Sequence, residues 1–262
     1  MTGKAMREQT AAIAKALLVV TLLFAPAAAG AQPLAPAAAD AQPPADDGNV
    51  VVHLIKDVAI DYKNFVSLDN APWIGLGGAA AAIMHAGDDT VDRYVVESNP
   101  ATLNGGNEYG AQYFQLPLAV AWWAIASAAG SERHAAVGRD LLRVQLSVVS
   151  WNFAIKLIAD RTRPNGDPRS FPSGHAANTF ATAMVLQEHY GWKAGLPAFA
   201  AATYTSISRV LEHQHWASDV VFGAAVGMAA GRTVTLHVRE TRVSIAPLAV
   251  PGGGGVMVTA LR

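Results

Sequence analysis

The residues best suited to chemistry lie late in the chain, in the segment SRVLEHQHWASD at 208–219. It contains two histidines two positions apart, and Asp219 follows His215 by four positions. On a helix, this spacing lets the carboxylate accept a hydrogen bond from one ring nitrogen and leave the other free and basic. His215 could then act as a nucleophile or general base, although a helix that starts with an acidic first turn shows the same spacing.

The two histidines could instead suggest a metal site. On a helix, His213 and His215 point about 200° apart, so they share a metal ion only if the segment is extended. The chain has no HExxH motif and no third histidine at ligand spacing, and Arg209 would repel a cation. We therefore predict no metal ligands here and place His213 and Glu212 at the surface or rim of a site.

Basic residues and a small-residue turn precede this segment. Lys156 and Arg163 in KLIADRTRP are seven residues apart, so they share a helix face and favour an anion, although either could simply stabilise a helix end. In RSFPSGH, Ser173 is a suitable N-cap and Gly174 lets a ligand approach the free N–H groups of the next helix. His175 could give that ligand a proton. An ordinary cap or a serine nucleophile is the alternative, but no GxSxG elbow supports the latter.

The elements that must position these residues are helical. Apolar stretches too long for strands predict helices near 54–67, 72–85, 110–129, 133–160, 175–190, 195–211 and 217–236. We therefore expect an all-α fold, a compact helical bundle. Residues 241–262 contain two β-branched runs around a glycine-rich turn and predict a short β-like tail, either a small hairpin or a frayed end.

The first 48 residues have a different composition. Basic residues, the apolar run 16–26 and the small residues after it resemble a secretory signal, so we expect a signal peptide over 1–31 and export to the periplasm or beyond. An anchoring helix is the alternative, although the run is shorter than the roughly 20 residues that span a bilayer. Residues 32–48 are rich in Ala and Pro and predict a linker, and the functional domain should cover 49–240.

Composition limits the classes of partner. The net charge of −1 and the lack of a lysine-rich block give a nucleic-acid partner no support, and the absence of cysteine excludes thiolate chemistry. Segment 109–130 is uncharged over 22 residues and long enough to span a membrane. Most other helices carry charges, so the composition favours a soluble bundle over the alternative, a protein with several membrane spans, and leaves peripheral membrane contact open.

Together, three motifs are similar to the signature of the type 2 phosphatidic acid phosphatase (PAP2) and vanadium-dependent haloperoxidase superfamily. They are Lys156 with Arg163-Pro164 after six residues, Pro172-Ser173-Gly174-His175, and Ser208-Arg209 with His215 and Asp219 at the signature spacing. The resemblance covers about 64 residues. The helical pattern of the rest fits the α-helical bundle of that family.

The resemblance implies a role for each position. His215 would attack phosphorus and form a phosphohistidine, Asp219 would orient it, and His175 would protonate the leaving group and then activate water. The phosphate oxygens would be held by Lys156, Arg163, Ser173, Gly174 and Arg209. Because these cations would do what Mg²⁺ does in other phosphoryl transfers, no cofactor is implied. Arg161 and Arg169, in the same stretch, could add to this positive field, but we favour their interpretation as solvated loop charges.

The resemblance implies a metal-independent phosphatase that acts on phosphate monoesters or diphosphates of lipids, such as phosphatidic acid or isoprenyl diphosphates, and the signal-like N-terminus predicts that it is exported. A soluble, secreted acid phosphatase of broad specificity would use the same residues. A vanadate-dependent haloperoxidase would hold vanadate at the same positions, but the domain is small for that class. We expect the loops near 69–73 and 97–110 to border the site and select the substrate.

Overall fold

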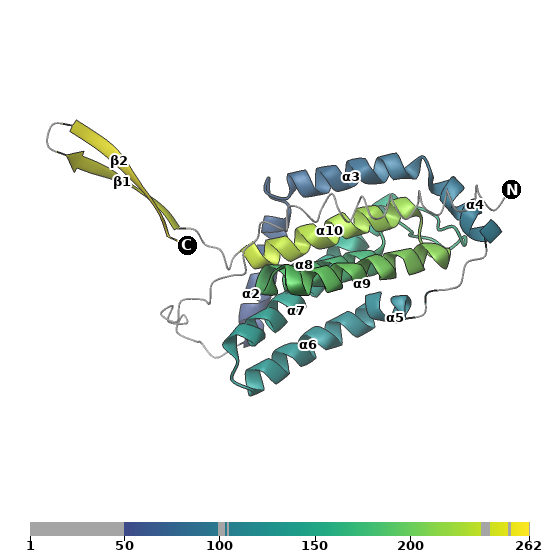
Figure 1. The fold of residues 1–262 in the computed structure, drawn as a ribbon, viewed down its shortest axis with the longest axis horizontal. Helices are drawn as coiled ribbons and strands as arrows, with labels where there is room; N and C mark the ends of the chain where they lie inside the picture. The colour runs from purple at the N-terminus through teal and green to yellow at the C-terminus, as the bar shows by residue number, and fades with distance from the viewer. Residues whose placement is uncertain (1–49, 99–102, 104, 237–241, 251–252, 262) are drawn as a thin grey trace.

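The computed structural model of the protein describes residues 50–98, 103, 105–236, 242–250 and 253–261. The predicted signal peptide at 1–31 and linker at 32–48 lie outside the described residues. The helices are α2 (Val50–Phe65), α3 (Ala71–His85), α4 (Asp88–Ser98), α5 (Gly106–Gly110), α6 (Gln112–Ala128), α7 (Glu132–Ala159), α8 (Gly174–Tyr190), α9 (Trp192–Leu211) and α10 (Ala217–Leu236) (Figure 1). The predicted all-α fold of the domain is confirmed.

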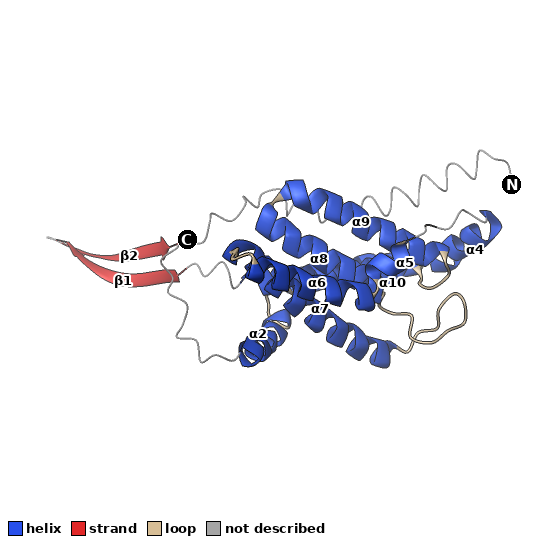
Figure 2. Ribbon diagram, turned by 90° about the horizontal axis from the view of Figure 1, so that it is seen from below, coloured by secondary structure: helices blue, strands red, loops and turns tan. Residues whose placement is uncertain are grey.

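The C-terminal tail contains the only strands among the described residues. Strand β1 (Arg242–Val250) pairs antiparallel with β2 (Gly253–Leu261), with Arg242 opposite Leu261 and Val250 opposite Gly253 (Figure 2). Of the two forms that the sequence left open for the tail, the structure therefore has the hairpin.

All seven segments that were predicted to be helical form helices, and their ends differ from the prediction by a few residues. Two further helices, α4 and α5, were not predicted. The sequence of α4, DDTVDRYVVES, mixes charged and apolar residues, and α5 has only five residues. The uncharged segment 109–130 is interrupted, because Ala111 is extended and separates α5 from α6.

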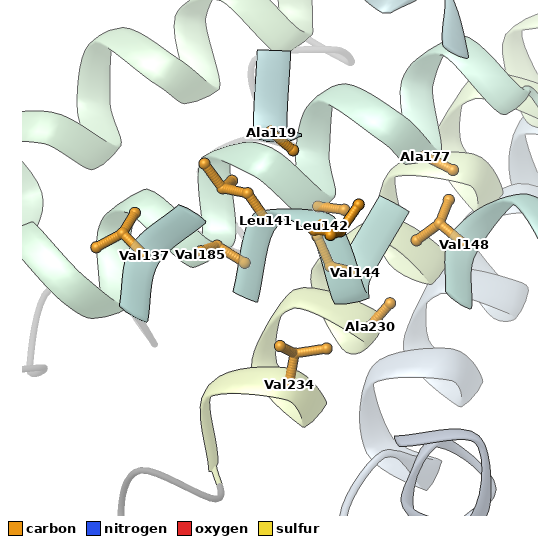
Figure 3. Packing of buried hydrophobic residues seen from close by; sticks show 11 residues of the cluster. Ala119, Val137, Leu141, Leu142, Val144, Val148, Ala177, Val185, Ala230 and Val234 are labelled. Carbon is orange, nitrogen blue, oxygen red and sulfur yellow. The ribbon is translucent and has the colours of Figure 1, made fainter. Parts of the chain in front are cut away.

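Helices α7, α8 and α10 enclose the main hydrophobic core. Figure 3 shows its members pointing toward one another from these helices and from α6; they are Ala119, Val137, Leu141, Leu142, Val144, Val148, Ala177, Ala181, Val185, Ala230 and Val234. Helix α9 lies along α8, α3 covers α10, and α6 lies along α7. The core thus holds α8 at the centre of the bundle.

A stripe of glycines brings α10 against the backbone of α8. Gly223, Gly227 and Gly231 are spaced by four and share one helix face. A Cβ atom at Gly227 would lie 2.2 Å from the carbonyl oxygen of Ala177, and one at Gly223 would lie 2.5 Å from that of Ser173. This close packing fixes the start of α10 beside the start of α8, where the motif residues meet.

Helix α7 is the one helix of the described part of the chain that is long and apolar enough to cross a membrane, and 39% of its apolar window is buried inside the fold. Helix α6 has 17 residues.

Candidate active site

The three motifs come together at one end of the bundle, although they lie on different elements. Lys156 is in the last turn of α7, His175 in the first turn of α8, and His215 in the loop between α9 and α10. The backbone N–H of Ser173 donates to the carbonyl oxygen of Asp219 at 3.0 Å, and this bond joins the start of α8 to the start of α10.

His215 and Asp219 form a buried pair. The distance between His215 Nδ1 and Asp219 Oδ2 is 3.4 Å, and the side chains are 3% and 0% exposed. Asp219 Oδ2 also accepts hydrogen bonds from the backbone N–H of Trp216 at 2.9 Å and from the hydroxyl of Ser170. His215 lies in the loop before α10, and Asp219 lies in the first turn of α10, since α9 ends at Leu211 and α10 begins at Ala217. The pair therefore joins a loop residue to a helix residue and does not lie on one helix.

The surroundings keep this pair in the state that a nucleophile requires. Burial lowers the pKa of His215 to about 4, the charges of Lys156 and Arg163 add to this, and the hydrogen bond with Asp219 opposes it. Burial alone would raise the pKa of Asp219, but hydrogen bonds from His215 and Ser170 and the charges of His215 and Arg161 lower it overall. At neutral pH, a neutral imidazole therefore faces a carboxylate. If Nδ1 carries the proton and donates it to Asp219, Nε2 presents a free lone pair.

The cations of the motifs lie around this histidine. Lys156 Nζ donates to the carbonyl oxygens of Arg169 at 2.7 Å and Ser170 at 3.2 Å, and Arg163 Nη1 donates to Gln214 Oε1 at 2.8 Å. Burial, helped by the nearby charge of Arg163 and opposed by that of Asp219, lowers the pKa of Lys156 to about 8. Two cations that repel each other in this way favour an anion between them.

Arg209 is held from two sides. Its Nη1 donates to Asn107 Oδ1 at 2.9 Å and to Glu212 Oε2 at 2.8 Å, and only 6% of its side chain is exposed. Among the described residues, its Nε is buried and has no hydrogen-bond partner. The side chain of Glu212 is 27% exposed, and its carboxylate orients Arg209. His213, its neighbour, pairs instead with Asp92 at 2.7 Å.

His175 lies within the field of these cations. Burial lowers its pKa to about 3, and the charges of Arg209, His215 and Arg163 contribute, while a backbone interaction at Asn107 opposes the shift. Its Nε2 is also buried without a partner in the described part of the chain. A Cβ atom at Gly110 would lie 3.0 Å from the ring atom Cδ2 of His175, so α5 packs directly on this ring.

The first turn of α8 completes the site. Ser173 caps the helix, because its Oγ accepts from the N–H of Ala176 at 3.4 Å, as the sequence predicted. Ser173 is fully buried. A Cβ atom at Gly174 would meet no atom within 4 Å, so the backbone here faces open space that a ligand can enter. We call the group formed by Lys156, Arg163, Ser173, Gly174, His175 and Arg209 the anion site.

Two sequence-based expectations need correction. Arg161 is not a solvated loop charge, because it forms ion pairs at 2.8 Å with both Asp88 and Asp219, which are buried. The segment 69–73 does not border the site: Asn70 Nδ2 donates to Thr233 Oγ1 at 2.6 Å, and Thr233 lies about 21 Å along α10 from Asp219. The other expected segment, 97–110, does reach the site through Asn107.

Comparisons with known proteins agree with the motifs. Residues 141–242 match the family model described as the PAP2 superfamily. The chain is 43% identical over 100 residues to Lipid A 1-phosphatase of Porphyromonas gingivalis, a match that covers 37% of this chain and 21% of that protein. It is 34% identical over 79 residues to Lipid A 4'-phosphatase of Helicobacter pylori, over 30% of this chain and 40% of that protein.

The matches thus span less than half the length of these two curated relatives. Among solved structures, the chain is similar to a transmembrane PAP2 type phosphatidylglycerolphosphate phosphatase from Bacillus subtilis. The identity is 20%, the match covers 73% of this chain and 97% of that one, and the TM-score is 0.43.

Proposed function

We propose that this protein is an exported, membrane-associated phosphatase that hydrolyses a phosphate monoester or diphosphate of a lipid through a phosphohistidine on His215. One observation carries the proposal: two buried nitrogens, Arg209 Nε and His175 Nε2, have no partner among the described residues and lie beside a neutral, buried histidine. Because buried polar groups are nearly always paired in proteins, a site of this kind fits an anion whose oxygens accept from Arg209 Nε and, once His175 is protonated, from His175 Nε2.

The geometry suits a two-step transfer. In the first step, Nε2 of His215 attacks phosphorus, the bond from phosphorus to the leaving oxygen breaks, and His175 gives that oxygen its proton. In the second step, the oxygen of a water molecule attacks phosphorus, the bond from phosphorus to Nε2 of His215 breaks, His175 accepts a proton from the water, and inorganic phosphate leaves. Asp219 stabilises the positive charge on the ring of His215 in both steps.

His175 needs its proton when the substrate is bound. Burial and the surrounding cations lower its pKa to about 3, whereas a phosphate dianion in the anion site would offset those cations and raise it again. The substrate would thus supply the negative charge that makes His175 an acid. Deprotonation of His175 after transfer then suits its second role as the base.

Exposed apolar side chains favour a lipid over a soluble ester. Large hydrophobic residues are more than 60% exposed on several helices, namely Leu76 and Ile83 on α3, Tyr113 and Ile125 on α6, Ile158 on α7, and Trp192 and Leu196 on α9. Such an apolar surface is typical of contact with a membrane or an amphipathic partner. The names of both curated relatives also point to phosphorylated lipids, so lipid A phosphates are the first substrates to test.

The experiment is a phosphate-release assay with the full chain in detergent. The substrates are lipid A, phosphatidic acid, an isoprenyl diphosphate and para-nitrophenyl phosphate. We expect release from at least one lipid at a higher kcat/KM than from para-nitrophenyl phosphate, and a preference for the nitrophenyl ester would favour a broad acid phosphatase. His215→Asn should abolish release, while the matched variant His213→Asn should retain it. Release that survives His215→Asn would refute the proposal.

A further inference from the structure

We propose that Arg161 and Asp88 are positioning residues of this reaction, which fix the Asp219 carboxylate so that it can orient His215. The inference rests on the proposed function for its kinetic consequences, but the geometry that carries it is independent of the substrate. Neither residue belongs to the three motifs, and Asp88, in α4, lies 130 positions before Ser218 in the sequence.

Arg161 bridges two buried carboxylates. Its Nη1 donates to Asp219 Oδ1 at 2.8 Å and to Ser218 Oγ at 2.7 Å. Its Nη2 donates to Asp88 Oδ2 at 2.8 Å. Asp88 and Asp219 are 2% and 0% exposed, and the side chain of Arg161 is 22% exposed. The guanidinium therefore neutralises part of a buried negative charge that would otherwise be costly.

Asp88 anchors the opposite side of the same loop. Its Oδ1 accepts from the backbone N–H of Ser218 at 3.0 Å, and its Oδ2 accepts from the hydroxyl of Ser218 at 2.5 Å. The ring of His85 lies 3.0 Å from both Asp88 Oδ2 and Arg161 Nη2 at the exposed edge. The first turn of α4 is thereby attached to the first turn of α10, next to Asp219.

The same arginine also contacts Trp216, the residue that follows His215. The guanidinium carbon of Arg161 lies 5.1 Å from the ring centre of Trp216, and the indole N–H donates to the carbonyl oxygen of Thr162 at 2.7 Å. The backbone N–H of Trp216 donates to Asp219 Oδ2.

The two oxygens of Asp219 consequently have separate tasks. Oδ1 is bound to Arg161, while Oδ2 is left to His215, Ser170 and the N–H of Trp216. If the carboxylate were released from Arg161, it could rotate and no longer select the Nδ1–H form of His215. The lone pair on Nε2, which the nucleophile needs, depends on that selection.

The test compares Arg161→Gln and Asp88→Asn with two exposed controls, Arg139→Gln on α7 and Asp89→Asn beside Asp88. We expect kcat to fall about 10- to 100-fold in the two test variants, as for other groups that orient a reacting side chain. KM should change less than twofold, since neither residue belongs to the anion site. Arg161→Lys, which keeps the charge, should recover part of kcat, and both controls should equal the wild type.

A second readout does not depend on turnover. Nitrogen NMR shifts of His215, assigned by comparison with His215→Asn, report which ring nitrogen carries the proton. We expect the Nδ1–H form in the wild type and both controls, and a mixture with the Nε2–H form in Arg161→Gln and Asp88→Asn.

An unchanged tautomer in the folded test variants would overturn the inference, as would an Nε2–H form in the wild type. Thermal melting identifies any variant that does not fold. If Arg161→Gln does not fold, the isosteric variant Asp88→Asn decides whether the inference holds. If no substrate is hydrolysed by the wild type, the proposed function fails, but the tautomer measurement still decides the role of Arg161.

Discussion

The substitution Asp219→Asn separates the chemistry of the site from its stability. The side chain keeps its shape but loses its charge and replaces one acceptor oxygen with an NH₂ group. Oδ1 accepts from Arg161, and Oδ2 accepts from Ser170 and from the N–H of Trp216. Whichever way the amide turns, its NH₂ group faces another donor, so at least one buried hydrogen bond is lost.

The structure allows the cost to be worked out. Loss of one partner from a buried ion pair destabilises a protein by about 3–5 kcal/mol. Arg161 retains Asp88 as a second partner, so we expect the lower end, about 3 kcal/mol. A domain with a stability of about 5–15 kcal/mol stays folded after such a loss. The rate should suffer more, by about 10⁴-fold in kcat, because the amide favours the wrong tautomer of the histidine.

The assay pairs lipid phosphate release with urea unfolding, and Asp89→Asn serves as the matched surface control. A large loss of kcat with a folded protein supports the assigned role of Asp219. If the folded Asp219→Asn protein turns over within tenfold of the wild type, the pair with His215 is structural and the mechanism is wrong.

Three further outcomes are expected. The pKa of His215 is about 4 in the folded state and about 6.5 when unfolded, so only the unfolded chain gains this proton as the pH falls. The free energy of unfolding should therefore decline by on the order of 3 kcal/mol between pH 6.5 and 4. Urea titrations of His215→Asn should show a smaller decline, and an equal decline in this variant would contradict a buried, neutral His215. Arg209→Lys should raise the inhibition constant of inorganic phosphate about 10- to 100-fold, since a charged hydrogen bond contributes about 1.5–3 kcal/mol; an unchanged constant would remove Arg209 from the anion site. Phosphate release should survive EDTA, and a complete loss restored by Mg²⁺ or Zn²⁺ would show that a metal is required.

Much of the fold could be predicted because long apolar stretches bounded by glycine and polar residues identify buried helices without knowledge of their neighbours. Helix α4 was missed for the opposite reason. Its first residue, Asp88, is buried by contacts with Ser218 and Arg161 rather than by an apolar pattern of its own, and those partners are 130 and 73 residues away.

In the site, too, local patterns could be predicted from the sequence, whereas contacts between distant residues could not. Lys156, His175 and His215 occupy helix ends and a loop, and their motifs specify local geometry that the sequence displays. Arg161 looked like an ordinary loop charge, because nothing near it in the sequence indicates a buried carboxylate. The misplacement of 69–73 has a related cause, since only the packing of α3 along α10 determines which end of the bundle that turn occupies.

The most direct test of the mechanism is to trap the phosphorylated enzyme. Wild-type protein is mixed with an intact lipid substrate that the release assay has shown it to hydrolyse. The reaction is quenched in alkali within milliseconds, and the protein is digested for mass spectrometry under conditions that preserve phosphohistidine. We predict a phosphoryl group on His215 that is absent in His215→Asn and accumulates in a variant that lacks the base, His175→Asn, with a substrate whose leaving group needs no proton. A phosphoryl group on Ser173 or His175, or turnover without any phosphorylated enzyme, would contradict the account.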